Sequence, residues 1–244
     1  MNIKIIPFIT TFIAGISTLL GIIPTYLKIN EKKLLNFSLS FSAGIMISIS
    51  IFSLIPESFK YLNQNYLIEL PIIIIEIILG IYLSKGIDIF INNKENNKLK
   101  KINFITIIAL ILHNIPEGVI TYLTTSNNIK LGIILAIGIT LHNIPEGLAI
   151  AIPMYYIYKD HNKVFIYTLI SGFSELLGAL LAALFLTNYI TPQLLSLLLA
   201  ITSGIMIFVS IEELLKTALE EKNKYTYIFF IIGLITMYII SKII

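Results

Sequence analysis

The feature that most constrains this chain is a series of eight apolar stretches, each long enough to cross a lipid bilayer as a helix. A helix needs roughly 20 predominantly apolar residues to span the hydrocarbon core. Short polar connections separate the stretches, so the sequence predicts an all-α, polytopic protein of the cell membrane with a single transmembrane domain over residues 1–244. The expected helices lie near residues 4–27, 34–59, 68–91, 102–124, 129–157, 164–187, 192–220 and 225–243.

The first stretch is expected to be retained as a helix, because it is too long for the apolar region of a secretory signal and lacks a small-residue cleavage site. Lysine positions predict the orientation, since basic residues concentrate in cytoplasmic loops. Most lysines fall in the connections that follow helices one, three, five and seven, and few lie on the opposite side. The first set comprises Lys28, Lys32, Lys33, Lys94, Lys98, Lys100, Lys101, Lys159, Lys163, Lys222 and Lys224. The set on the opposite side comprises Lys4, Lys60, Lys130 and Lys242. Both termini are therefore predicted to lie outside.

The charge and the absence of cysteine exclude several classes of function. The net charge of +3 is explained by the lysine-rich loops, so no nucleic-acid partner is predicted and the lipid bilayer is the expected environment. With no cysteine, the chain has no disulfide and no thiolate site, and any bound metal is held by nitrogen and oxygen. No prosthetic group is expected. The longest polar connection, residues 92–101, reads as a flexible linker without histidine.

A weak internal echo relates the second and seventh stretches. Gly-Ile-Met-Ile at residues 44–47 recurs at residues 204–207, and each copy is followed by Ser-Ile and Leu at the same spacing. The second and seventh of eight helices run in opposite directions, so the echo indicates an inverted repeat. Many transporters build a central site on such a repeat.

A much stronger echo occupies the fourth and fifth stretches. The hexapeptide His-Asn-Ile-Pro-Glu-Gly stands at residues 113–118 and again, letter for letter, at residues 142–147. Five of its six residues are polar or helix-breaking, which makes chance recurrence inside adjacent membrane helices a poor explanation. Because the two helices are antiparallel neighbours, the motif is presented twice around one axis near the middle of the bilayer.

The spacing inside the hexapeptide favours metal binding. Residues four apart share a helix face, so His113 with Glu117 and His142 with Glu146 each direct an imidazole and a carboxylate at one place. An ionised glutamate at the centre of a membrane helix costs about 2.5–3.5 kcal/mol, and a divalent cation between two of them removes that cost and their repulsion. Imidazole, carboxylate and amide oxygen suit zinc, iron, manganese or cobalt. The alternative for a single copy is a proline kink with a satisfied polar pair.

On these paired hexapeptides the chain resembles the ZIP (Zrt/Irt-like) divalent metal transporters, in particular their bacterial branch. The resemblance extends over essentially the whole chain, including residues 38–57, 127–153 and 171–178. It implies eight helices with both termini outside, the first three related to the last three by inverted symmetry around a central pair. It also implies a homodimer and a two-metal site that imports divalent ions into the cytoplasm by alternating access, with one helix group carrying the site.

The resemblance also implies a set of metal ligands. His113, Glu117, His142 and Glu146 correspond to a first subsite. Asn114 and Asn143 join Glu117, Glu146 and Glu175 at a second subsite. Glu175 has an alternative in a pairing with a hydroxyl group. Some family members carry an acid at the position of Asn143, so the amide here leaves the second subsite less charged.

Other polar residues in the spans have weaker assignments. Glu57 could gather cations at the outer entrance or be a simple interfacial residue, and Glu212 with Glu213 could receive the ion on exit or be solvated helix-end charges. Glu76 and Asp88 are expected to pair with Lys85 or with hydroxyl groups. His161 is expected to be exposed to solvent.

Transport of a divalent ion, zinc or else iron, manganese, cobalt or cadmium, is the preferred function, and two other classes compete with it. Zinc proteases carry His-Glu-x-x-His and di-iron bundles carry Glu-x-x-His, whereas the spacing here is His-x-x-x-Glu. Every nearby acidic residue is assigned as a metal ligand, so no catalytic residue is predicted and the chain is not expected to be an enzyme. A metal-sensing receptor would need a signalling domain, which the sequence lacks.

Overall fold

The computed structural model describes residues 5–62, 66–92, 94–95, 97–186 and 191–243. Across these residues, eight helical spans are long and apolar enough to cross a membrane, and no strand is present. Each span begins and ends within four residues of its predicted bounds, so the prediction of eight spanning helices is confirmed. Lys4, Asn93, Asn96 and the predicted end of the sixth helix at residue 187 lie outside the described residues.

Several spans are built from more than one kind of helix. In chain order the elements are α1 (Ile5–Ile16), η1 (Ser17–Tyr26), α2 (Glu31–Ile49), η2 (Ser50–Leu54), α3 (Ile55–Lys60), α4 (Tyr66–Asn92), α5 (Lys98–Asn127), α6 (Ile129–Tyr158), α7 (His161–Leu181), η3 (Ala182–Leu186), α8 (Pro192–Phe208), η4 (Val209–Leu215), α9 (Lys216–Glu220) and α10 (Thr226–Ile243). Here η1 is a 3₁₀-helix, whereas η2, η3 and η4 are π-helical turns. Such turns are frequent at functional sites.

Side-chain caps explain where several helices begin. The first backbone N–H groups of a helix have no partner within the helix, and a polar side chain just before it can accept their hydrogen bonds. The capping residues are Asn30 for α2, Asn97 for α5, Asn128 for α6, Asp160 for α7 and Thr191 for α8. Asn97 starts α5 four residues earlier than predicted, which shortens the linker before it.

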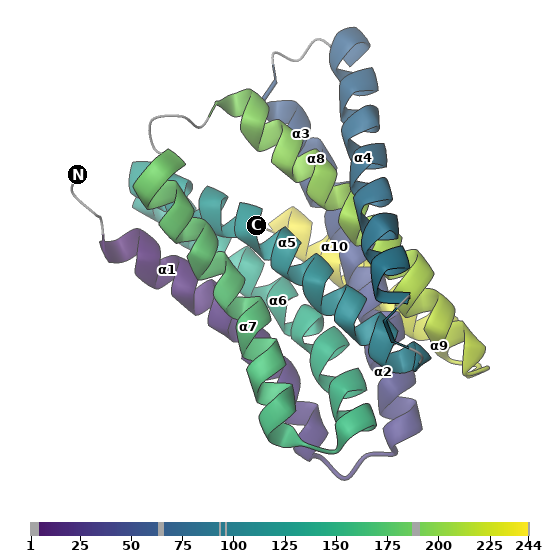
Figure 1. Cartoon of the computed structure of the whole chain (residues 1–244). Helices are drawn as coiled ribbons and strands as arrows, with labels where there is room; N and C mark the ends of the chain where they lie inside the picture. The colour runs from purple at the N-terminus through teal and green to yellow at the C-terminus, as the bar shows by residue number, and fades with distance from the viewer. Residues whose placement is uncertain (1–4, 63–65, 93, 96, 187–190, 244) are drawn as a thin grey trace.

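The helices form two packed groups (Figure 1). One group contains α1, η1, α5, α6 and α7, in which α5 packs along α7 and η1 packs along α6. In the other group α2 packs along α10 and α4 packs along α8. Contacts of α2 with α6 and of α8 with α5 join the groups. The duplicated hexapeptides lie on α5 and α6. They therefore belong to the first group and lie beside the boundary between the two groups, which we call the seam.

The second and seventh spans share local structure as well as sequence. A Cβ on Gly44 would lie 2.1 Å from a backbone oxygen of α10, and one on Gly204 would lie 2.1 Å from a backbone oxygen of α4. Ser50 and Ser210 each donate to the carbonyl four residues earlier, at 2.9 and 2.6 Å. The π-helical turns η2 and η4 lie at these serines. These likenesses are what the predicted inverted repeat would produce; the repeat itself stays a prediction.

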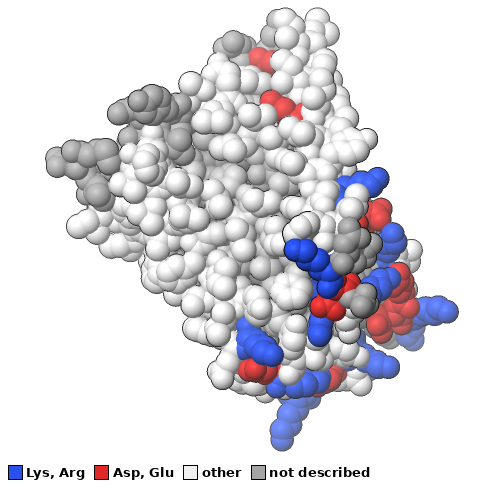
Figure 2. Space-filling view, in the orientation of Figure 1, with Lys and Arg blue, Asp and Glu red and all other residues white. Residues whose placement is uncertain are grey.

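Charged side chains gather at one end of the molecule, over α9, the start of α2 and the α6–α7 connection (Figure 2). Several form ion pairs there: Lys98 with Glu220, Lys101 with Asp88, Lys159 with Glu31 and Lys216 with Glu212. This is the end that the lysine distribution assigns to the cytoplasm. The orientation relative to the membrane stays a prediction.

His161 is less exposed than the sequence indicates. Its ring stacks on Tyr26 at a centroid distance of 4.1 Å and on Tyr155 at 4.6 Å, and its Nδ1 lies 3.3 Å from the hydroxyl of Thr25. The stacking joins the end of η1 to the α6–α7 connection. The contact with Tyr26 comes from a segment that is distant in sequence, so it is not visible in the local sequence around His161.

Candidate metal centre

The two hexapeptides lie near the middle of two long neighbouring helices. α5 and α6 each continue without interruption through Pro116 and Pro145, and the two helices pack against one another. A histidine and a glutamate four residues apart on each helix point to the same side. The helix period therefore places four ionisable side chains between α5 and α6.

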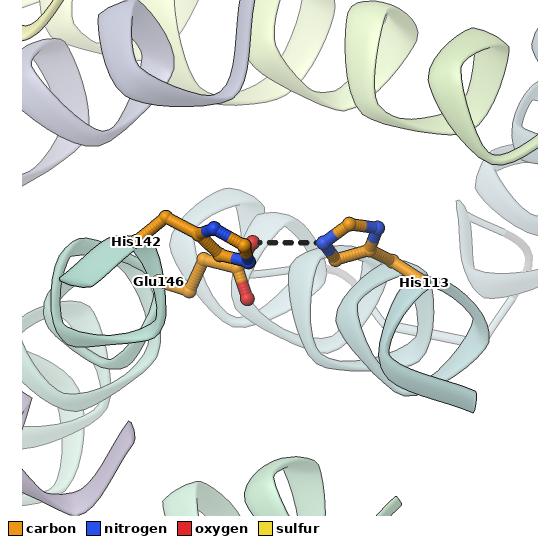
Figure 3. Close-up of side chains that lie close together, drawn as sticks. All are labelled: His113, His142 and Glu146. Carbon is orange, nitrogen blue, oxygen red and sulfur yellow. Dashed lines mark ion pairs between the residues drawn. The ribbon is translucent and has the colours of Figure 1, made fainter. Parts of the chain in front are cut away.

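The four side chains converge as predicted. His113 Nε2 lies 3.3 Å from Glu117 Oε1 on its own helix and 3.2 Å from Glu146 Oε1 on α6. His142 Nε2 lies 3.1 Å from Glu117 Oε2. Figure 3 shows His113 reaching across to Glu146 beside His142. One ligand atom from each of these three residues lies within 4.8 Å of the others, which is close enough for a single ion to contact all three.

The centre is sealed from solvent and short of hydrogen-bond donors. His113 and Glu146 are fully buried, and Glu117 and His142 are each 5% exposed. Among the described residues, neither oxygen of Glu146 and neither nitrogen of His113 has a hydrogen bond of good geometry. A buried carboxylate without donors is costly unless a cation or proton accompanies it. The donor set is nitrogen and oxygen without sulfur, which fits zinc and similar divalent ions.

The residues of the predicted second subsite lie beside the first. The side-chain nitrogen of Asn143 donates to a carboxylate oxygen of Glu175 on α7, so the partner of Glu175 is an amide and not the alternative hydroxyl. Asn114 donates to the carbonyl of Ser171 on α7 at 2.9 Å. Asn114 Oδ1, Asn143 Oδ1 and Glu175 Oε2 are buried and, within the described part of the chain, accept no hydrogen bond. These three oxygens remain available to an ion.

A third internal repeat, which the sequence analysis missed, flanks the centre. Residues 15–21 read Gly-Ile-Ser-Thr-Leu-Leu-Gly and residues 172–178 read Gly-Phe-Ser-Glu-Leu-Leu-Gly, which agree at five of seven positions. The signal was present in the sequence, but it consists of small and apolar residues that are common in membrane helices. We call residues 14–18, on α1 and η1, the threonine flank, and residues 171–175, on α7, the glutamate flank.

The two flanks make matching close contacts. A Cβ on Gly15 would lie 2.4 Å from the carbonyl oxygen of Gly172, and a Cβ on Gly172 would lie 2.3 Å from that of Gly15. In the same way, a Cβ on Gly147 would meet the carbonyl oxygen of Thr18 at 1.9 Å, and one on Gly118 would meet that of Glu175 at 1.9 Å. Glycine lets each flank touch the backbone of the other flank and of one hexapeptide.

Hydrogen bonds repeat the same correspondence. Asn143 donates to the carbonyl of Ala14 at 2.9 Å, which is the counterpart of the 2.9 Å bond from Asn114 to Ser171. Ser17 donates to Ala14 at 2.6 Å, and Ser174 donates to Ser171 at 2.5 Å. Each hexapeptide is therefore anchored to one flank by its asparagine. The correspondence supports the inverted relation of the first and sixth spans that the family resemblance implies.

The remaining acidic residues lie outside this cluster. Glu57 pairs with Lys60 at 2.9 Å on the surface, and exposed Glu212 pairs with Lys216 at 2.9 Å. Among the described residues, Asp88 pairs with Lys101 at 2.6 Å and not with Lys85 or a hydroxyl group, because the packing of α4 on α5 brings the two side chains together. Glu76 is partly exposed and, among the described residues, does not make the expected pairing with Lys85 or a hydroxyl group. Glu213 is 5% exposed and therefore buried, unlike a solvated charge at a helix end.

Comparison with known proteins places these observations in a family. Residues 92–241 match the model of the family described as "ZIP Zinc transporter". The chain is 35% identical over 253 residues to the zinc transporter ZupT of Campylobacter jejuni, with 87% of each protein covered. It is 34% identical to the zinc transporter ZupT of Akkermansia muciniphila, with 88% of each covered. For the zinc transporter ZupT of Clostridium perfringens the identity is 32%, over 97% of this chain and 95% of the relative.

Proposed function

Since this chain belongs to the ZIP zinc transporter family, we propose that it imports zinc into the cytoplasm through a metal site inside the membrane. The whole of residues 1–244 acts as one transport domain in the cell membrane. The relatives are named as zinc transporters, and transport rather than catalysis is the activity proposed here.

The observation that carries the proposal is the convergence of four buried side chains from the duplicated hexapeptide. His113, Glu117, His142 and Glu146 meet between α5 and α6, two spans of 30 residues each, where isolated buried charges are costly. A divalent ion entering this centre would replace its water shell with imidazole and carboxylate ligands. Without thiolate ligands the ion is held less firmly, which suits a site that must also release it.

A second subsite adjoins the first. In this proposal Asn114, Asn143 and Glu175 contribute oxygen atoms to a second ion, and Glu117 with Glu146 bridges the two ions. The support is the three buried oxygens that accept no hydrogen bond elsewhere in the described chain. Three carboxylates and two amides form a weaker, less charged site than one with an acid at the position of Asn143.

Movement of the ion requires alternating access. The seam between the two helix groups passes beside the centre, and we expect the group of α1, α5, α6 and α7 to carry the ion as it moves against the other group. Binding competes with protonation, because imidazole and carboxylate ligands must lose their protons to hold metal. Uptake should therefore fall when the medium on the loading side is acidified.

The direct test is uptake of radiolabelled zinc by proteoliposomes. His113→Ala combined with His142→Ala removes both imidazoles, and we expect uptake to fall more than about tenfold, since even indirect supports of a metal ligand are worth 10–100-fold in metal affinity. His161→Phe is the matched control. It removes the third histidine of the chain, which lies outside the centre, and keeps an aromatic ring for stacking. Unchanged uptake in the double variant would refute the proposal. Competition by iron, manganese, cobalt and cadmium in the same vesicles measures selectivity.

We further propose that the protein is a homodimer. Of the eight described spans, those formed by α4 and α10 are the least enclosed, with 22% and 17% of the residues in their apolar 18-residue stretches buried. Both therefore leave broad faces for lipid or for a second copy. Cysteine pairs introduced along either face into this cysteine-free chain would test the contact by cross-linking in the membrane.

A further inference from the structure

The two flanks of the metal centre differ in chemistry at one position. The same spacing from the shared glycine leads to Glu175 on the glutamate flank and to Thr18 on the threonine flank. The two side chains start from equivalent places. A Cβ on Gly15 would lie 3.2 Å from Glu175 Cβ, and a Cβ on Gly172 would lie 3.3 Å from Thr18 Oγ1. Both residues are fully buried.

Thr18 leaves its flank without a charge or a free proton donor. Its hydroxyl donates to the carbonyl of Gly15 at 2.8 Å. On the other flank, the Glu175 carboxylate accepts a hydrogen bond from Asn143. The counterpart of Asn143 is Asn114, whose Oδ1 accepts no hydrogen bond among the described residues. One side of the centre thus has an amide, Asn143, together with a carboxylate, Glu175. The equivalent place on the other side has the amide of Asn114 and the hydroxyl of Thr18 in place of a carboxylate.

Counting charges shows what the missing carboxylate does. The centre contains three buried carboxylates, Glu117, Glu146 and Glu175. One divalent ion leaves the centre with one excess negative charge, and two divalent ions leave it with one excess positive charge. A fourth carboxylate would make the centre with two ions neutral. Ligand charge is one of the main determinants of the affinity of carboxylate sites for divalent ions.

We infer that the residue at position 18 sets the charge of the metal centre and thereby how firmly a second ion is held. This inference rests on the proposed function and extends it to a residue outside the ligand set. Threonine keeps the fully loaded centre positively charged, so the second ion is bound weakly and leaves readily. Glutamate at this position would form, with Asn114, a second pair of amide and carboxylate equivalent to Asn143 and Glu175, and would retain the ion.

The experiment uses the full-length protein and four variants: Thr18→Glu, Glu175→Thr, the double variant that exchanges the two residues, and Thr18→Ser as the control. Equilibrium binding of radiolabelled zinc to purified protein gives the number of ions and their affinities, and proteoliposomes give the maximal uptake rate. For Thr18→Glu we expect the second ion to bind about tenfold more tightly and the maximal uptake rate to fall. Glu175→Thr should lose the second ion, the exchange variant should regain it, and Thr18→Ser should match the wild type.

Several results would overturn the inference. One is a folded Thr18→Glu variant whose second-ion affinity is unchanged, and another is an exchange variant that binds no better than Glu175→Thr. If Thr18→Glu does not fold, Thr18→Asp carries the same charge on a shorter chain and decides the question. Failure of both to fold would show that the threonine flank lacks the space for a carboxylate and would also refute the inference. If the wild type takes up no zinc, the proposed function is refuted instead, so the two failures are distinguishable.

Discussion

The threonine flank and the glutamate flank lie beside the same candidate metal centre and make matching backbone contacts, but they differ in charge. A Cβ added to Gly15 or to Gly172 would lie 2.4 or 2.3 Å from the carbonyl oxygen of the other glycine, and each hexapeptide asparagine donates to a flank carbonyl at 2.9 Å. The contacts that agree are made by main-chain atoms, glycines and asparagines. The contact that differs is made by one side chain, Thr18 or Glu175. The matching contacts thus fix the positions of the two flanks, and the difference in charge comes from the residue at position 18 or 175.

The correspondence does not extend to the end of the repeat, because the contacts match through Thr18 and differ at Gly21 and Gly178. Span one winds as the 3₁₀-helix η1 from Ser17, whereas α7 remains α-helical to Leu181. A 3₁₀-helix rises about 2.0 Å per residue against 1.5 Å in an α-helix, so equivalent residues drift apart along the axis. A Cβ on Gly21 would accordingly meet the backbone carbon of Gly147 at 2.3 Å, while one on Gly178 would meet the carbonyl oxygen of Ile115 at 2.1 Å.

The strongest test of the shared architecture is at the glycine crossing. Gly15→Ala and Gly172→Ala should each lower the free energy of unfolding by about 1–3 kcal/mol, because the added methyl group would overlap a backbone oxygen of the opposite flank. Thermal unfolding in detergent measures the effect. Gly86→Ala is the matched control, since a Cβ there meets nothing within 4 Å. A large loss for one glycine with none for the other would show that the flanks are not equivalent.

The difference in charge predicts unequal effects of removing polarity from the flanks. Glu175→Gln keeps an oxygen to accept from Asn143 and removes the charge, so we expect the apparent affinity for zinc in uptake to fall about tenfold. Thr18→Val removes a hydroxyl that donates to Gly15 and should leave that affinity within about twofold. Equal losses in the two variants would contradict the assignment of the second subsite to the glutamate flank.

The two asparagines should differ by a smaller amount. Asn114→Ala and Asn143→Ala each remove one hydrogen bond to a flank carbonyl, which is worth about 1 kcal/mol of stability. Asn143→Ala also leaves Glu175 without its amide partner, so it should reduce zinc uptake more than Asn114→Ala does. Stability from thermal unfolding and uptake in proteoliposomes separate the two contributions. The reverse order of uptake would indicate that the second ion lies on the threonine flank.

Much of the fold and the centre could be predicted because their signals are local. The eight spans follow from hydropathy, since lipid requires every backbone polar group to be satisfied within a helix. The convergence of His113, Glu117, His142 and Glu146 follows from the helix period and from the antiparallel arrangement of two neighbouring helices.

The features that escaped prediction depend on contacts between distant segments. The pairing of Asp88 with Lys101 and the stacking of His161 on Tyr26 require helix packing that local patterns do not encode. The flanking repeat was missed for a different reason. Its identities are glycine, serine and leucine, and their meaning appears only when Gly15 and Gly172 are seen to cross.

The central claim is that one cation is held by imidazole and carboxylate groups from both hexapeptides, and X-ray absorption at the zinc edge tests it most directly. For the wild-type protein with one equivalent of zinc, we predict nitrogen and oxygen ligands at roughly 2.0–2.2 Å, with the outer-shell scattering of two imidazole rings. That imidazole signal should disappear in the variant combining His113→Ala with His142→Ala. A zinc spectrum without imidazole in the wild type, or one unchanged in the double variant, would contradict the account.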